Sequence, residues 1–140
     1  MLQAMPTEIE DLCEAIEDSY EFTLSYAAKG MAADEASSLG QQLREKLSRA
    51  ASAMRGLEPA SASLLGAGQL TPVEKYRAFF DVMVRDAQSA ATAVELVLAQ
   101  AVIGTQLIDN LNASIHLRAL LTDLFLVTEI LAARKPVAAE

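Results

Sequence analysis

The stretch TPVEKYRAFFDVMVRDAQSAATAVELVLAQA, residues 71–101, decides the fold class of this 140-residue chain. Thr71 followed by Glu74 is typical of a capping box, in which two side chains satisfy the free N–H groups at a helix start. Pro72 fits the first helical position, where its missing N–H costs nothing. The stretch therefore predicts a long helix whose apolar residues recur at alternating steps of three and four: Val73, Tyr76, Phe80, Met83, Ala87, Ala90, Val94, Val97 and Ala101.

The N-terminal part of the chain predicts two further helices. Thr7 and Glu10 form a second capping-box pattern, and a helix from there is expected to end near Lys29 and Gly30. Another helix is predicted over residues 33–55. Seven acidic residues crowd the first of these helices, whereas the second is basic in its later half, so we expect the two to pair as an antiparallel hairpin. The bases are Arg44, Lys46 and Arg49.

Residues 56–70 are the one clear interruption of the helical pattern. The segment contains Pro59 and several Gly and Ser residues, which favour a break in a helix. We interpret it as a crossover loop between two helical hairpins. The whole chain, residues 1–140, is then one all-α domain with the architecture of a four-helix up-down bundle, with loose ends at 1–6 and 136–140.

The last predicted helix is apolar on most of its sides. Thr105 and Asn112 are alternative starting points, residues 115–131 form its apolar part, and Arg134, Lys135 and Pro136 end it. A helix that is apolar nearly all round is buried nearly all round, and a simple bundle buries only one stripe. We therefore expect a homodimer, with this helix and the alanine-rich part of the preceding one at the interface. The predicted interface residues are Leu117, Leu120, Leu121, Leu124, Val127, Leu131, Ala87, Ala90 and Val94.

Composition excludes several classes of function. A formal net charge of −8 disfavours nucleic-acid binding, which needs clustered Lys and Arg. The apolar stretch around Glu95 also contains glutamines and many alanines, so no membrane span is expected. One cysteine, Cys13, cannot form an internal disulfide. With no secretory signal pattern at the start, we expect a cytoplasmic protein.

The sequence offers little for catalysis or metal binding. His116 is the only histidine, so neither a Glu-x-x-His di-iron pattern nor a zinc site can be assembled. His116 as a phosphoacceptor is an open alternative to an ordinary surface histidine. Cys13 lies among acidic residues, which raise a thiol pKa and disfavour a reactive thiolate. We expect no cofactor, no metal and no enzymatic activity.

Two functions remain. The first is a non-catalytic protein–protein interaction module, such as an adaptor, an assembly factor or a secretion-type chaperone, acting on an unidentified protein partner and on itself. The second is a ligand-responsive regulatory domain with a pocket between the third and last helices. There Glu95, with Arg118 or Arg85 as its counter-charge, would line the pocket. The plainer interpretation is that Glu95, Asp123 and Glu129 point to solvent.

Overall fold

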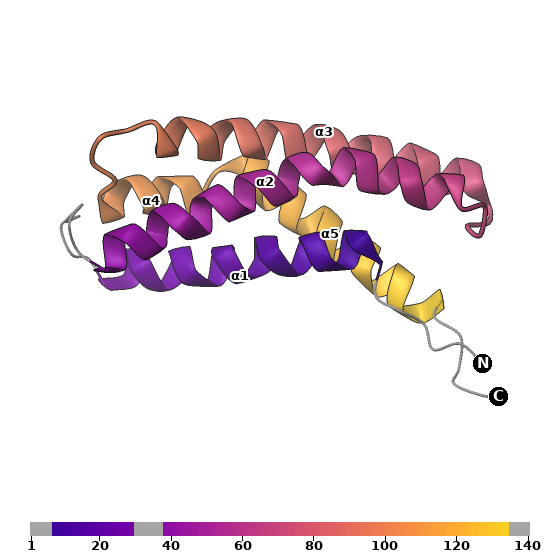
Figure 1. The fold of residues 1–140 in the computed structure, drawn as a ribbon, viewed down its shortest axis with the longest axis horizontal. Helices are drawn as coiled ribbons and strands as arrows, with labels where there is room; N and C mark the ends of the chain where they lie inside the picture. Colours follow the sequence, from indigo (N-terminus) through magenta and orange to yellow (C-terminus); the bar gives the residue numbers. More distant parts are fainter. Residues whose placement is uncertain (1–6, 30–37, 135–140) are drawn as a thin grey trace.

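The chain is all-helical, as the sequence predicts. The computed structural model describes residues 7–29 and 38–134, and these ranges contain five helices and no strand. Figure 1 shows α1 and α2 side by side, α3 along α2, and α5 running diagonally away from the far end of α4. The ends predicted to be loose, 1–6 and 136–140, lie outside the described residues. The helices are α1 (Glu8–Lys29), α2 (Ser38–Gly66), α3 (Val73–Leu98), α4 (Thr105–Asn112) and α5 (Ile115–Arg134).

The start of α1 confirms the capping box predicted for Thr7 and Glu10. The Thr7 N–H donates to the Glu10 carboxylate at 2.7 Å, and the Glu10 N–H donates to the Thr7 hydroxyl at 3.1 Å. The predicted pairing of an acidic with a basic helix is also present, because Lys46 on α2 forms an ion pair with Asp18 on α1 at 2.7 Å. This contact lowers the pKa of Asp18.

The predicted crossover loop at residues 56–70 is wrong. Helix α2 continues through Pro59 to Gly66, and its buried positions Leu57, Ala60 and Ser61 extend the same inward stripe. Burial of that stripe outweighs the helix-breaking tendency of the proline. The turn to α3 is short, and within it Gly68 has φ +77°, a conformation that side-chain-bearing residues rarely adopt.

Helix α3 begins at Val73, one residue later than predicted, and its cap differs from the prediction. Pro72 is the N-cap residue, and no side chain caps the helix, so the expected capping box of Thr71 and Glu74 is absent. The helix ends at Leu98, three residues before the predicted seam ends. Arg44 of α2 holds this end by donating to the carbonyls of Leu98, Gln100 and Ala101 at 2.8–3.1 Å.

The prediction of four helices is also wrong, because the last helical region is divided in two. Helix α4 begins at Thr105, one of the two predicted starts, and ends at Asn112. Helix α5 then begins at Ile115, where the Ser114 hydroxyl accepts a hydrogen bond from the His116 N–H at 3.2 Å. A two-residue break redirects the chain, so α5 runs diagonally to the direction of α4 (Figure 1) while it packs mainly on α3.

Candidate interaction surface

The nine residues predicted to form a dimer interface lie instead in the core of the single chain. Each is 5 % exposed or less. The six α5 residues face inward, where α5 packs mainly on α3, and the three α3 residues lie on the buried side of that helix. These side chains therefore stabilise the protomer and are not available for docking. They are Leu117, Leu120, Leu121, Leu124, Val127, Leu131, Ala87, Ala90 and Val94.

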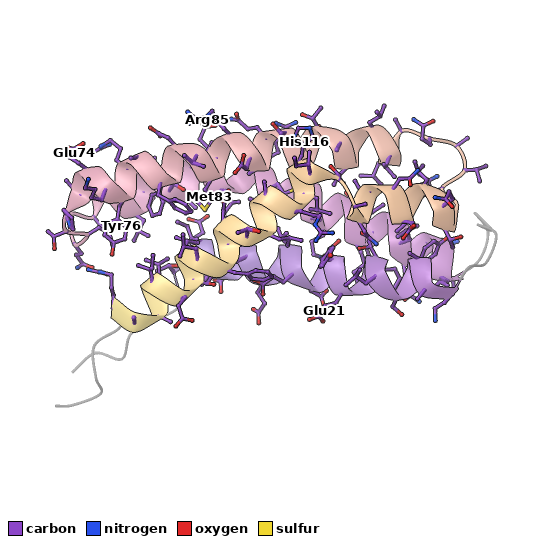
Figure 2. The ribbon with its side chains drawn as sticks, turned by 180° about the vertical axis from the view of Figure 1, so that it is seen from behind. Glu21, Glu74, Tyr76, Met83, Arg85 and His116 are labelled. Carbon is purple, nitrogen blue, oxygen red and sulfur yellow. The ribbon has the colours of Figure 1, made fainter. Side chains whose placement is uncertain are left out.

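A second apolar side of α5 faces away from the bundle. Ile115 is 74 % exposed, Phe125 58 % and Leu126 50 %, and Ile130, at the edge of this side next to α3, is 37 % exposed. Figure 2 shows α5 lying across α1 and α3 with no described helix over it. We use "outer face of α5" for Ile115, Ala119, Thr122, Leu126, Glu129 and Ala133, which follow one another at steps of four and three and so share one side of the helix.

The outer face of α5 is poor in charge. Glu129 is exposed on this face and Arg118 is exposed beside it, next to Ala119, and within the described residues neither side chain forms an ion pair. They cannot reach each other, since eleven residues of helix separate them by about 16 Å. The Thr122 hydroxyl donates to the Arg118 carbonyl at 3.0 Å. A partner can therefore bury the Thr122 side chain without leaving an unsatisfied donor.

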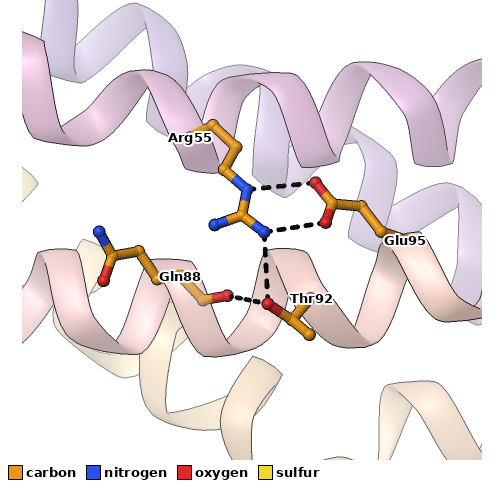
Figure 3. Close-up of polar contacts among 4 residues, drawn as sticks. All are labelled: Arg55, Gln88, Thr92 and Glu95. Carbon is orange, nitrogen blue, oxygen red and sulfur yellow. Dashed lines mark hydrogen bonds and ion pairs between the residues drawn. The ribbon is translucent and has the colours of Figure 1, made fainter.

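Glu95 and Arg118, predicted to line a pocket, are not brought together. Glu95 is exposed and forms a two-pronged ion pair with Arg55 of α2, at 2.8 and 3.1 Å (Figure 3). The same guanidinium reaches the Thr92 hydroxyl, which itself donates to the Gln88 carbonyl at 2.8 Å. This contact with Arg55 lowers the pKa of Glu95. Arg55 is thus the partner of Glu95 that the sequence analysis missed. The predicted pocket lined by Glu95 and Arg118 is not formed by these residues.

The concave regions lie elsewhere in the molecule. A groove of about 590 Å³ between α2 and α3 is lined by Arg85, Arg77, Asp81 and Glu58 among others, so Arg85 faces α2 and not Glu95. A smaller apolar cleft of about 150 Å³ separates α3 from α5 and is lined by residues including Tyr76, Phe79 and Ile130. Its lining adds no convergent set of polar groups, and it does not reach Glu95 or Arg118.

Neither Cys13 nor His116 belongs to a reactive cluster. Cys13 is buried in the core, and burial, followed by the charges of Glu17 and Glu10, raises its pKa to about 12. The direction of this pKa shift agrees with the prediction, although burial contributes more to the shift than the carboxylates do. His116 is exposed at the start of α5 (Figure 2). Among residues 7–29 and 38–134, no three potential metal ligands gather, and no helix combines the length and apolarity needed to cross a bilayer.

Asp123 differs from the other carboxylates that interrupt the apolar helices. We expected the Asp123 side chain to point to solvent. It is instead half-buried near Asp86 of α3, and its Oδ2 atom has no hydrogen-bond partner among the described residues. Two carboxyl groups can hydrogen-bond each other only when one of them is protonated. Burial, then the hydrogen bond and charge of Asp86, raise the pKa of Asp123 to about 7.

This carboxyl pair predicts that stability falls as the pH rises. In the unfolded chain the Asp123 carboxyl ionises near pH 3.8, and in the folded chain near 7. Between these values the folded state holds the extra proton, so the free energy of unfolding decreases through this window and levels off above it. For a partly exposed group we expect a loss on the order of 1 kcal/mol.

Asp123→Asn tests this dependence by urea unfolding at pH 5 and pH 8. The variant should be more stable than the wild type at pH 8 and should lose less stability between the two pH values. Asp86→Asn is the matched substitution of the other carboxyl and should have a smaller effect of the same sign, because the burial of Asp123, the largest cause of its raised pKa, remains. Parallel pH profiles for wild type and both variants would contradict the shared proton.

Comparison with known proteins supplies no functional information. No protein-family model matches the chain, and searches of curated proteins and of solved structures find no match. The function must therefore be argued from the surface and chemistry of the chain itself.

Proposed function

We propose that this protein is a non-catalytic helical interaction module that binds a protein partner through the outer face of α5. The observation that carries the proposal is the exposure of three large apolar side chains on the uncovered side of this helix: Phe125 and Leu126 together, and Ile115 about 15 Å away along the helix. Leu126 and Ile115 belong to the outer face, and Phe125 flanks it. Single exposed apolar residues are common and need no explanation, but several large ones on the uncovered side of one helix are typical of a binding surface. A helix presenting such side chains suits helix-to-helix or helix-in-groove recognition.

The charge distribution supports α5 over α1 as the docking element. Helix α5 carries two acids, Asp123 and Glu129, and two bases, Arg118 and Arg134. The acidic excess of the protein is concentrated elsewhere, since seven acids lie between Glu8 and Glu21 on α1. Charged side chains are depleted at interface centres because their desolvation is costly, so the balanced, apolar face is the favoured one.

The proposal can be tested by site-specific photo-cross-linking. A photoreactive amino acid at position 126 is expected to give covalent protein adducts, in purified protein or in the cells that make it. Leu24 on α1 is the matched control, because it is also an exposed leucine, 45 % against 50 % for Leu126. Position 24 should give no adduct above background. Equal labelling from both positions, or none from position 126, would overturn the proposal.

A further inference from the structure

We propose that the outer face of α5 binds a second copy of this chain, with the two α5 helices antiparallel about a twofold axis. This inference rests on the proposed function and names its partner. It starts from the spacing of the outer face, whose six positions follow at steps of 4, 3, 4, 3 and 4. That series reads the same in both directions, so each position of one copy falls level with a position of a reversed second copy, as a twofold interface requires.

The reversed pairing centres the twofold axis level with position 124. Ile115 of one copy then lies opposite Ala133 of the second copy, and Thr122 lies opposite Leu126 of the second copy. A large side chain faces a smaller one at each of these levels, which suits the interdigitation of packed helices. The Thr122 hydroxyl bonds within its own helix, so its methyl group can be buried at this level.

The two unpaired charges fit the same register. Glu129 faces Ala119 of the second copy, and Arg118 is the residue before that alanine. The reversed pairing therefore brings Arg118 of each copy beside Glu129 of the other, although the two residues lie about 16 Å apart within one helix. A carboxylate in the middle of an apolar seam would be costly alone, and a guanidinium from the second copy offsets that cost. A parallel pairing would instead place Arg118 beside Arg118.

The apolar flank supports the same axis. Phe125 lies seven residues after Arg118, which places it on the same side of α5 and one residue from the axis. Two 58 %-exposed rings meet there in the dimer, and neither is covered in the single chain. The acidic α1 helices do not belong to this contact surface, so the interface avoids the main source of repulsion between two chains of net charge −8.

Charge reversal tests the pairing, with mass measured by light scattering over a range of protein concentrations. The wild type should have twice the mass of a single chain. Arg118→Glu or Glu129→Arg alone should weaken dimerisation about tenfold or more, because each creates two like-charged pairs. The double variant should restore most of the affinity. Leu126→Glu should give a folded monomer, and Leu24→Glu should leave the dimer intact.

Cysteine cross-linking tests the orientation, since the native Cys13 is buried and will not interfere. Ile115→Cys alone should form no disulfide between chains, because the antiparallel pairing separates the two sites by about 27 Å. A mixture of the Ile115→Cys and Ala133→Cys variants should cross-link. Cross-linking of Ile115→Cys with itself would overturn the antiparallel arrangement, as would failure of the mixed pair to react in a confirmed dimer.

The outcomes separate this inference from the proposed function. A monomer at every concentration whose position 126 still cross-links to a different protein would overturn the homodimer and leave the interaction module standing. A dimer that persists in Leu126→Glu would place self-association on another surface and overturn the inference. A monomer with no adduct from position 126 would overturn both.

Discussion

Leu124→Asp is expected to unfold the protein at neutral pH. Leu124 is fully buried on the inner face of α5, where that helix packs on α3. The substitution removes the apolar contacts of the leucine and leaves a carboxylate without a partner, which costs several kcal/mol. That is a large part of the roughly 5–15 kcal/mol by which a domain of this kind is stable. Loss of the helical circular-dichroism signal, or a large fall in the urea midpoint, would be the measured result.

Two controls separate burial from the chemistry of the substitution. Leu126→Asp makes the same change two residues away, on the exposed side of the same helix, and should retain the fold. Its urea midpoint should be compared at low protein concentration, where dimer formation adds little stability. Glu17→Ala should change the free energy of unfolding by less than about 0.5 kcal/mol, or raise it, since partial burial, and then the charges of Glu21 and Glu14, already raise the pKa of Glu17. Similar urea midpoints for Leu124→Asp and Leu126→Asp would contradict the assignment of Leu124 to the buried face of α5 and Leu126 to the exposed face.

Local sequence signals predicted the helices wherever those signals agreed with one another. In α3, the alternating three- and four-residue steps from Val73 to Val97 correspond to buried positions along most of the helix. At α1, the reciprocal bonds of Thr7 and Glu10 follow from side chains three residues apart and need no distant contact. Such features depend on the period of the helix and on capping chemistry, so a sequence displays them directly.

The errors occurred where distant packing decided the outcome. Gly56 and Pro59 favour a break, yet α2 passes through both, with Leu12 of α1 lying against the Gly56 position at 3.5 Å from where a Cβ would be. The inward stripe continues through Leu57 and Ala60, and its burial depends on contacts with distant residues, which local signals do not include. Conversely, the break before α5 at Ala113 and Ser114 contains no proline or glycine.

The candidate site was only half predictable from the sequence. The residues between Ile115 and Leu131 indicate that α5 carries more apolar surface than one buried stripe requires. Which of its apolar sides turns inward depends on how α5 crosses α3, and periodicity does not contain that angle. The side with Leu120 and Leu124 was therefore assigned to the interface, while Leu126 holds the exposed position. The partner of Glu95 was missed similarly, because Arg55 meets it only through the register of α2 against α3.

Pro59→Ala is expected to stabilise the protein by about 2 kcal/mol. Proline within a helix costs about 3 kcal/mol relative to alanine, because it cannot donate to the carbonyl four residues earlier and its ring crowds that carbonyl. About 1 kcal/mol is returned by the rigidity that proline gives the unfolded chain, so the difference should favour the variant. Pro59 is exposed, so its removal leaves no cavity in the core.

Urea unfolding of Pro59→Ala beside Glu58→Ala measures this gain. Glu58 is the exposed neighbour in the same turn and contributes only a long hydrogen bond, accepted from Gln88 at 3.4 Å. Its replacement should stay within about 0.5 kcal/mol of the wild type. A higher midpoint for Pro59→Ala alone would show that α2 is held through residues 57–66 by burial of Leu57 and Ala60, against the preference of its proline. If Pro59→Ala were instead less stable than the wild type, the packing of α2 on α3 would depend on a bend that the proline imposes, and a straight helix would separate those buried residues from their contacts.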